Sequence, residues 1–106
     1  MGGKMSRNKG ARFERTVARL LTENGWPATR GCQFQGGADS PDVRATTFPW
    51  HLECKAVERL DLYGAMTQAI ADSGGQKMPA VVHKRNRSDI LFTCKLQDLL
   101  DHLLNQ

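Results

Sequence analysis

Two carboxylates and one ammonium group stand at a spacing that suits the hydrolysis of phosphodiesters. Pro41-Asp42 is followed, after ten residues, by Glu53-Cys54-Lys55. Residues 50–57 have the composition of a strand, in which successive side chains point to opposite faces. Glu53 and Lys55 therefore point the same way, about 6–7 Å apart along the strand.

A hairpin would complete this group. Asp42-Val43-Arg44-Ala45 is a candidate strand, and a turn around Thr47-Phe48-Pro49 would pair it with the next strand and bring Asp42 beside Glu53. Two carboxylates held close repel each other unless a cation or a proton lies between them. Mg²⁺ takes oxygen ligands, commonly one or two carboxylates with water and phosphate, so it suits such a site.

A purely structural interpretation is also open. In it, Asp42 caps a strand, while Glu53 and Lys55 form an exposed ladder on a solvated face. In the catalytic interpretation, Lys55 offsets the charge that develops at phosphorus in the transition state.

The two short motifs resemble the PD-(D/E)xK nuclease signature, and the surrounding sequence is similar to the small Holliday-junction resolvases of archaea and phages. Residues 9–15 (KGARFER) open the first helix as in those resolvases, and residues 25–30 (GWPATR) lead through a glycine-rich loop into the aspartate as theirs do. The resemblance covers roughly residues 9 to 104. It implies a restriction-endonuclease-like core, metal-dependent cleavage that leaves 5′-phosphate and 3′-hydroxyl ends, and a two-fold dimer on branched DNA.

The resemblance also implies roles for individual residues. Asp42 and Glu53 would bind the metal directly, and the main-chain carbonyl of Cys54 would complete the ligands. Lys55 would orient the attacking water, and Glu14 would hold a metal-bound water. We expect Mg²⁺ as the cofactor, with Mn²⁺ as a substitute.

The position of Glu14 can be checked from the helical pattern. An apolar stripe recurs at i, i+4, i+7 and i+8 in Phe13, Val17, Leu20 and Leu21. Glu14 falls at the edge of that stripe and is the acidic residue of the helix best placed to face inward. Alternatively, it only complements the positive end of the helix near its N-terminus.

Three further residues are secondary candidates. Residues 28–34 are predicted to form the first strand, followed by a loop with turn residues. In that loop, Ser40 is placed to contact metal-bound water or a phosphate, and Asp39 is a rival of Asp42. Gln68 belongs to the second predicted helix, where many relatives of this fold place a glutamine near the site; such a residue is more often simply a polar helix position.

The predicted elements alternate between helix and strand. The first helix ends at Asn24-Gly25, and the second at Ser73-Gly74-Gly75. The second helix shows the stripe Tyr63, Met66 and Ile70, two short apolar strands follow at residues 80–83 and 89–93, and the last helix has the leucines Leu96, Leu99, Leu100, Leu103 and Leu104. The order αβββαββα predicts one α/β domain, a mixed sheet flanked by helices.

Length and charge agree with a small DNA-acting domain. The chain has 106 residues, which is room for one domain; we expect a flexible basic arm at residues 1–8 and the nuclease domain at 9–106. The net charge of +4 suits a polyanionic partner. We expect DNA contacts from cationic residues of the arm and first helix, from position 30 and from the second hairpin: Lys4, Arg7, Lys9, Arg12, Arg30, Lys84, Arg85 and Arg87. A basic hairpin is about as often simply a soluble edge.

Other residue types exclude several classes of function. Cys32, Cys54 and Cys94 are odd in number and widely spaced, so we expect reduced thiols in the cytoplasm of a prokaryotic cell or a phage-infected host. Neither cysteines nor histidines show zinc-ligand spacing, so we expect no zinc. No apolar run approaches the ~20 residues of a membrane span.

The favoured function is a Mg²⁺-dependent endodeoxyribonuclease that resolves Holliday junctions in DNA recombination as a homodimer. One alternative is another DNA nuclease of the same fold that cuts duplex, flapped or single-stranded DNA. A second alternative is a non-catalytic DNA-binding module. The presence of Glu14, Asp42 and Glu53 weighs against this second alternative, because acids repel phosphate.

Overall fold

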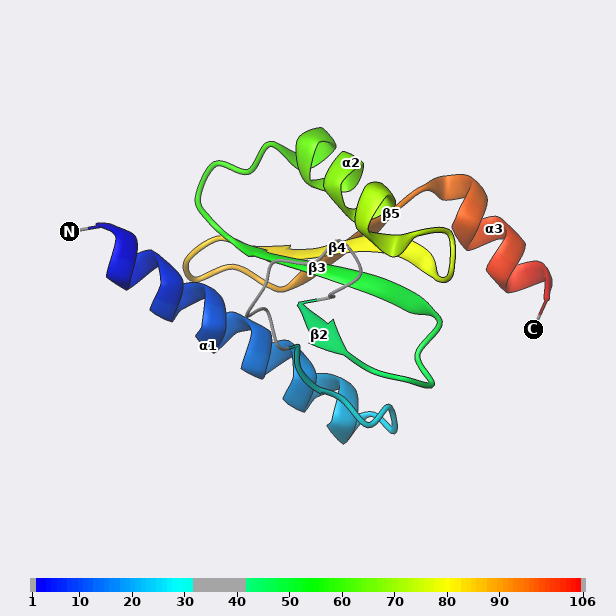
Figure 1. Ribbon diagram of the computed structural model, residues 1–106, viewed down its shortest axis with the longest axis horizontal. Helices are drawn as coiled ribbons and strands as arrows, with labels where there is room; N and C mark the ends of the chain where they lie inside the picture. Colours follow the sequence, from blue (N-terminus) through cyan, green and yellow to red (C-terminus); the bar gives the residue numbers. More distant parts are fainter. Residues whose placement is uncertain (1, 32–41, 106) are drawn as a thin grey trace.

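The described residues fold into a five-stranded mixed sheet flanked by helices (Figure 1). The computed structural model describes residues 2–31 and 42–105, with side chains described from residue 8 onward. The described elements follow in the order α1 (Gly2–Glu23), β1 (Thr29–Arg30), β2 (Val43–Arg44), β3 (Trp50–Ala56), α2 (Leu62–Ser73), β4 (Met78–Lys84), β5 (Leu91–Cys94) and α3 (Leu96–Leu104). The predicted α/β class and the order αβββαββα are confirmed.

The strands lie in the sheet in chain order, β1-β2-β3-β4-β5. β3 and β4 are parallel and the other neighbours are antiparallel. Parallel neighbours need a crossover connection, and α2 supplies it between β3 and β4. Figure 1 shows α1 on one face of the sheet and α2 on the other.

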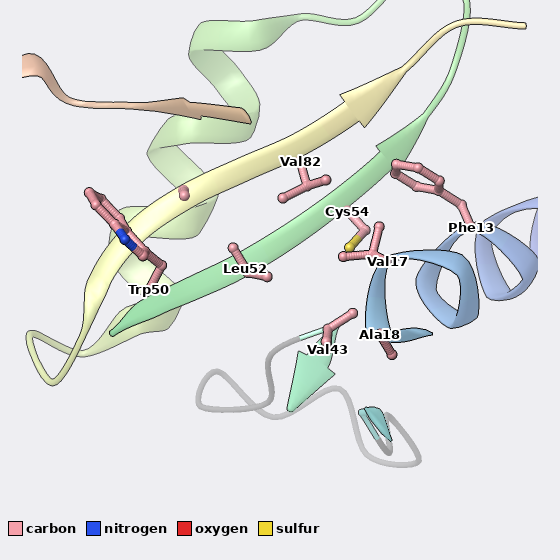
Figure 2. Packing of buried hydrophobic residues seen from close by; sticks show 9 residues of the cluster. Phe13, Val17, Ala18, Val43, Trp50, Leu52, Cys54 and Val82 are labelled. Carbon is pink, nitrogen blue, oxygen red and sulfur yellow. The ribbon is translucent and has the colours of Figure 1, made fainter. Parts of the chain in front are cut away.

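The alternation predicted for β3 is confirmed. Trp50, Leu52 and Cys54 are buried on the face that packs against α1, where Figure 2 shows Phe13 and Val17 beside Cys54. Leu52 is only 1% exposed and lies in the middle of this cluster. The other face of β3, with the alternate side chains, therefore faces α2.

The second helix approaches the sheet through small side chains. Its buried residues are Ala65, Ala69 and Ser73, and the two alanines pack against Val81 of β4. The predicted apolar stripe of this helix is wrong at its ends, because Tyr63 is 87% exposed and Ile70 is 43% exposed. Alanine brings the helix backbone close to the sheet, and Met66, the middle residue of the predicted stripe, packs against this cluster.

The ends of the elements follow the predicted stop signals. α1 ends at Glu23 and is followed by Gly25 at φ 97°, and α2 is followed by Gly74 in the left-handed conformation, at φ 60°. At the start of α2, the side chain of Asp61 accepts a hydrogen bond from the Gly64 N–H and so caps the helix. Such glycines and caps satisfy main-chain groups that a helix end leaves open.

Two boundaries differ from the prediction. Residues 2–8, expected as a flexible arm, continue α1 in the structure, so the helix begins at Gly2 and not at Lys9. The division into an arm and a domain at 9–106 stays a prediction. The described part of the first strand is Thr29–Arg30, and residues 32–34 of its predicted range lie outside the described residues. No described helix is long and apolar enough to cross a membrane.

Candidate functional site

Asp42 is fixed by three hydrogen bonds, two to β3 and one to the residue after β1. Its N–H donates to the Leu52 carbonyl (3.2 Å), and its carbonyl accepts from the Gly31 N–H (2.8 Å). Its side-chain Oδ2 accepts from the Cys54 N–H at 2.7 Å. The antiparallel register pairs Val43 with Leu52, which places Asp42 next to Glu53 as the hairpin prediction required. Asp42 is 8% exposed as a residue, so it is largely shielded from water, and the bond to Cys54 holds its carboxylate in place.

The carboxyl group of Glu53 lies on the α2 face of β3 and is 3% exposed. Burial, followed by the negative charges of Asp42 and Asp72, raises the pKa of Glu53 to about 8, and Lys55 only partly opposes this. A side-chain hydrogen bond to Asp72 raises the pKa further. Without a cation, Glu53 therefore holds a proton at neutral pH, and a cation bound here would take the place of that proton.

Helix α2 places two polar side chains, Gln68 and Asp72, next to Lys55 and Glu53 on this face of β3. Gln68 and Asp72 are four residues apart and therefore lie one above the other on the helix, about 6 Å apart. Lys55 Nζ donates to Gln68 Oε1 at 3.4 Å, and the side chain of Glu53 is hydrogen-bonded to that of Asp72. Helix α2 thus contacts both the ammonium group of Lys55 and the carboxyl group of Glu53.

Asp72 was missed in the sequence analysis. The signal that could have found it is its position four residues after Gln68 on the same side of the helix. It also lines a pocket of about 250 Å³, together with His51, Arg44 and Lys77. The polar side of α2 is therefore part of the candidate site.

Glu14 lies on the opposite side of β3, in α1. It is 9% exposed, so the prediction that it faces inward is confirmed. Its Oε1 accepts a hydrogen bond from Arg30 Nε at 2.7 Å. Burial raises the pKa of Glu14, the bond to Arg30 opposes this, and the charge of Asp42 adds to the rise. Glu14 is thus electrostatically coupled to Asp42, and Arg30, expected as a DNA contact, is already engaged with Glu14.

The donor groups present suit a hard divalent cation. Asp42 and Glu53 provide buried carboxylate oxygens whose mutual repulsion a cation would relieve. The N–H and carbonyl of one strand residue point to the same neighbour, so the Cys54 carbonyl faces the Asp42 side as its N–H does.

The number of side chains that could bind a metal limits which metal fits. Within the described residues, no three side chains of histidine, cysteine, aspartate or glutamate form a group that could hold a metal. Mg²⁺ needs only one or two carboxylates besides water and phosphate, so it fits this pair. The thiol of Cys54 points to the α1 face, and burial raises its pKa, so it packs as a neutral group.

The two basic groups predicted as separate surfaces meet in the fold. Lys9 and Arg12 of α1 lie across from Lys84 and Arg85, at the end of β4, and the four line a pocket of about 180 Å³. We call this the basic pocket. Arg87 follows in the exposed turn before β5, with φ 60°.

The side chains of four predicted residues cannot be placed. Ser40 lies outside the described residues, and so do the side chains of Lys4 and Arg7. The rival acid Asp39 lies there as well.

Comparison with known proteins gives one match. The family model described as "Archaeal holliday junction resolvase (hjc)" matches residues 5–69. This range covers more than half of the chain and runs from α1 into α2, so it includes Glu14, Asp42, Glu53, Lys55 and Gln68. No curated protein and no solved structure matches the chain.

Proposed function

Because the chain belongs to the archaeal Holliday junction resolvase family, a family of nucleases that hydrolyse DNA, we propose that it is a divalent-metal-dependent endonuclease that cuts four-way DNA junctions as a homodimer. The observation that carries the proposal is the bond of Asp42 Oδ2 to the Cys54 N–H, at 2.7 Å. It holds a second buried carboxylate against the strand that bears Glu53 and Lys55. The structural interpretation of an exposed ladder does not fit a glutamate that is 3% exposed.

In this proposal Asp42, Glu53 and the Cys54 carbonyl hold one Mg²⁺ ion, for which Mn²⁺ substitutes. When bound, the metal supplies a Lewis acid for the scissile phosphate. Glu53 would give up its proton when the cation binds, and the hydrogen bond that its protonated form makes with Asp72 would be lost with that proton. Metal binding is therefore coupled to proton release from Glu53.

The remaining residues act on water and charge. Lys55, held by Gln68 Oε1 at 3.4 Å, orients the attacking water and offsets the negative charge that develops on the phosphate. Glu14 is coupled to Asp42 from the α1 side and accepts a hydrogen bond from a water molecule at the site. Its partner Arg30 has a side chain that is 42% exposed, so part of its guanidinium group can also meet a phosphate.

DNA contacts are proposed for the basic pocket and the residues next to it in the chain. Four cationic side chains from α1 and the end of β4 line one pocket, which suits a phosphate backbone. Phosphate contacts position a protein without reading bases, so recognition would depend on the shape of the DNA. A four-way junction requires two symmetric cuts, which a two-fold dimer with one site in each copy provides.

The test is cleavage of a labelled four-way junction with Mg²⁺, Mn²⁺ or EDTA. We expect Asp42→Asn and Lys55→Ala to lower the cleavage rate by at least about 100-fold, since each removes a group that acts on the transition state. Binding of the junction should change little. Asp89→Asn makes the same chemical change as Asp42→Asn at an exposed position and serves as the control.

Each outcome separates the alternatives. Normal cleavage by either site variant would contradict the assignment of the site. Binding without cleavage by the wild type under every metal condition would indicate a non-catalytic DNA-binding module.

A further inference from the structure

The last helix packs on the domain through its polar side. The ring of His102 lies edge-on to Trp50, with centroids 5.8 Å apart, and Asp98 is partly buried. At 100° per residue, the leucine stripe is centred more than 120° around the helix from His102. α3 contains no buried residue. The members of the leucine stripe are 36% to 83% exposed: Leu96, Leu99, Leu100, Leu103 and Leu104. The apolar side of this helix therefore faces away from the domain that carries it.

Such an arrangement is unfavourable for an isolated copy. A nine-residue helix is marginal in water by itself, and helices of proteins are stabilised mainly by packing of their apolar face. Phe92 of the edge strand β5 is also 46% exposed and contacts Trp50 edge-on, so the exposed apolar surface continues onto the sheet.

The size of this surface indicates an interface. With on the order of 200 Å² for a fully exposed leucine or phenylalanine, these six residues expose roughly 700 Å². This is slightly more than the ~300–600 Å² of the largest apolar patch on a typical monomer. It is also most of the ~800 Å² that each partner buries in a standard protein interface, whose polar rim supplies the remainder.

Charge argues against nucleic acid or membrane as the occupant. The stripe is flanked by Asp98 and Asp101, with Lys95 as the only cationic residue of the segment 95–105. DNA phosphates and anionic lipids would meet these carboxylates. The basic pocket lies near the N-terminal part of α1, and Figure 1 shows α3 at the opposite end of the molecule.

We propose that α3 and the adjoining edge strand β5 form the interface between two copies of this chain, with the leucine stripes packed against each other about a two-fold axis. A stripe at i, i+3, i+4, i+7 and i+8 suits helix packing, and a two-fold axis lets one patch meet its own copy. Association at this end keeps the two basic pockets apart, at the outer ends of the dimer. The inference deepens the proposed function, on which the need for a dimer rests, by assigning the dimer surface.

The experiment measures the oligomeric state in the absence of DNA and metal. Sedimentation velocity over a concentration series is compared for wild type, Leu100→Glu, Leu103→Glu and the matched control Leu20→Glu. Leu100 is 50% exposed and Leu20, in α1, is 44% exposed, so the same change is made at similar exposure. We expect the dimer dissociation constant to rise at least about 100-fold in the two α3 variants, because a carboxylate enters an apolar contact, and to stay within a few-fold in the control.

A second measurement needs no variant. Hydrogen exchange of the wild type is followed above and below the dimer dissociation constant, and the amides of residues 96–104 should exchange more slowly in the dimer. Dimers of undiminished stability in the α3 variants, a wild type that is monomeric at all concentrations, or exchange in α3 that is independent of concentration would overturn the proposal. Neither readout involves cleavage, so failure of the interface assignment and failure of the nuclease assignment are distinguishable. If the wild type dimerises, Leu100→Glu is monomeric and the wild type does not cleave DNA, only the nuclease assignment is refuted.

Discussion

The buried carboxyl group of Glu53 should make the metal-free protein less stable as the pH rises. Its pKa is raised from 4.5 to about 8 in the folded state, by burial and by the charges of Asp42 and Asp72. Between these two values the folded state holds a proton that the unfolded state has lost, so the free energy of unfolding falls with increasing pH. The stability is fully present below about pH 4.5 and is lost progressively up to about pH 8.

The size of the effect follows from the shift. Each pH unit between the two pKa values changes the free energy of unfolding by at most about 1.4 kcal/mol, which sets an upper limit of about 5 kcal/mol for this range. We expect a measured loss of about 2 to 5 kcal/mol, since the site can relax when Glu53 ionises. Total stabilities of ~5–15 kcal/mol make this loss large.

Glu53→Gln isolates this contribution. The amide stays neutral at every pH and can still donate to Asp72, so the variant should match the wild type at pH 5 and exceed its stability by about 2 to 5 kcal/mol at pH 9. The assay is urea unfolding from pH 5 to 9 in EDTA. Glu23→Gln, at the exposed end of α1, is the matched control and should follow the wild-type profile.

The cation should reverse the effect in the wild type alone. Mg²⁺ at pH 8 should restore stability to the wild type and not to Glu53→Gln, because binding to the folded state stabilises it. Parallel pH profiles of the wild type and Glu53→Gln would refute the reasoning.

Three further perturbations test other parts of the structure. Asp72→Asn removes a negative charge that raises the pKa of Glu53 and keeps an oxygen that can accept a hydrogen bond, so the loss of stability between pH 5 and 8 should shrink in urea unfolding; an unchanged loss would exclude a contribution from the Asp72 charge. Asp61→Ala removes the cap of α2 and should lower the free energy of unfolding by about 1 kcal/mol at pH 7, with no change expected for Asp89→Ala. Replacing Lys84 and Arg85 by alanine should weaken junction binding and lower the slope of log affinity against log salt by about 2; an unchanged slope would show that the basic pocket does not contact phosphates.

Much of the fold and part of the site could be predicted from local patterns. The alternation of β3 determines which side chains share the face of Glu53, and the short turn after Ala45 determines that Asp42 returns to it. Glycines mark the ends of α1 and α2 because they adopt positive φ at low cost. These features depend on residues that are close in sequence.

The rest depends on tertiary contacts that no local pattern contains. Glu14 and Arg30 pair across sixteen residues, and Asp72 reaches Glu53 only because α2 crosses the sheet face at that point. The buried side of α2 was predicted only in part, because its alanines make the closest contact with the sheet and, of the three stripe residues, only Met66 packs beside them. In α3 the leucine pattern predicts the helix correctly, and its outward orientation is fixed by the packing of its opposite side.

The most direct test of the central proposal is strand-resolved cleavage of a four-way junction beside its linear duplex arms, with the wild-type protein and Mg²⁺. The account predicts paired, symmetric nicks near the branch point, with 5′-phosphate ends, and little cutting of the arms. Equal cutting of junction and arms would contradict junction selectivity and leave a general nuclease of this family.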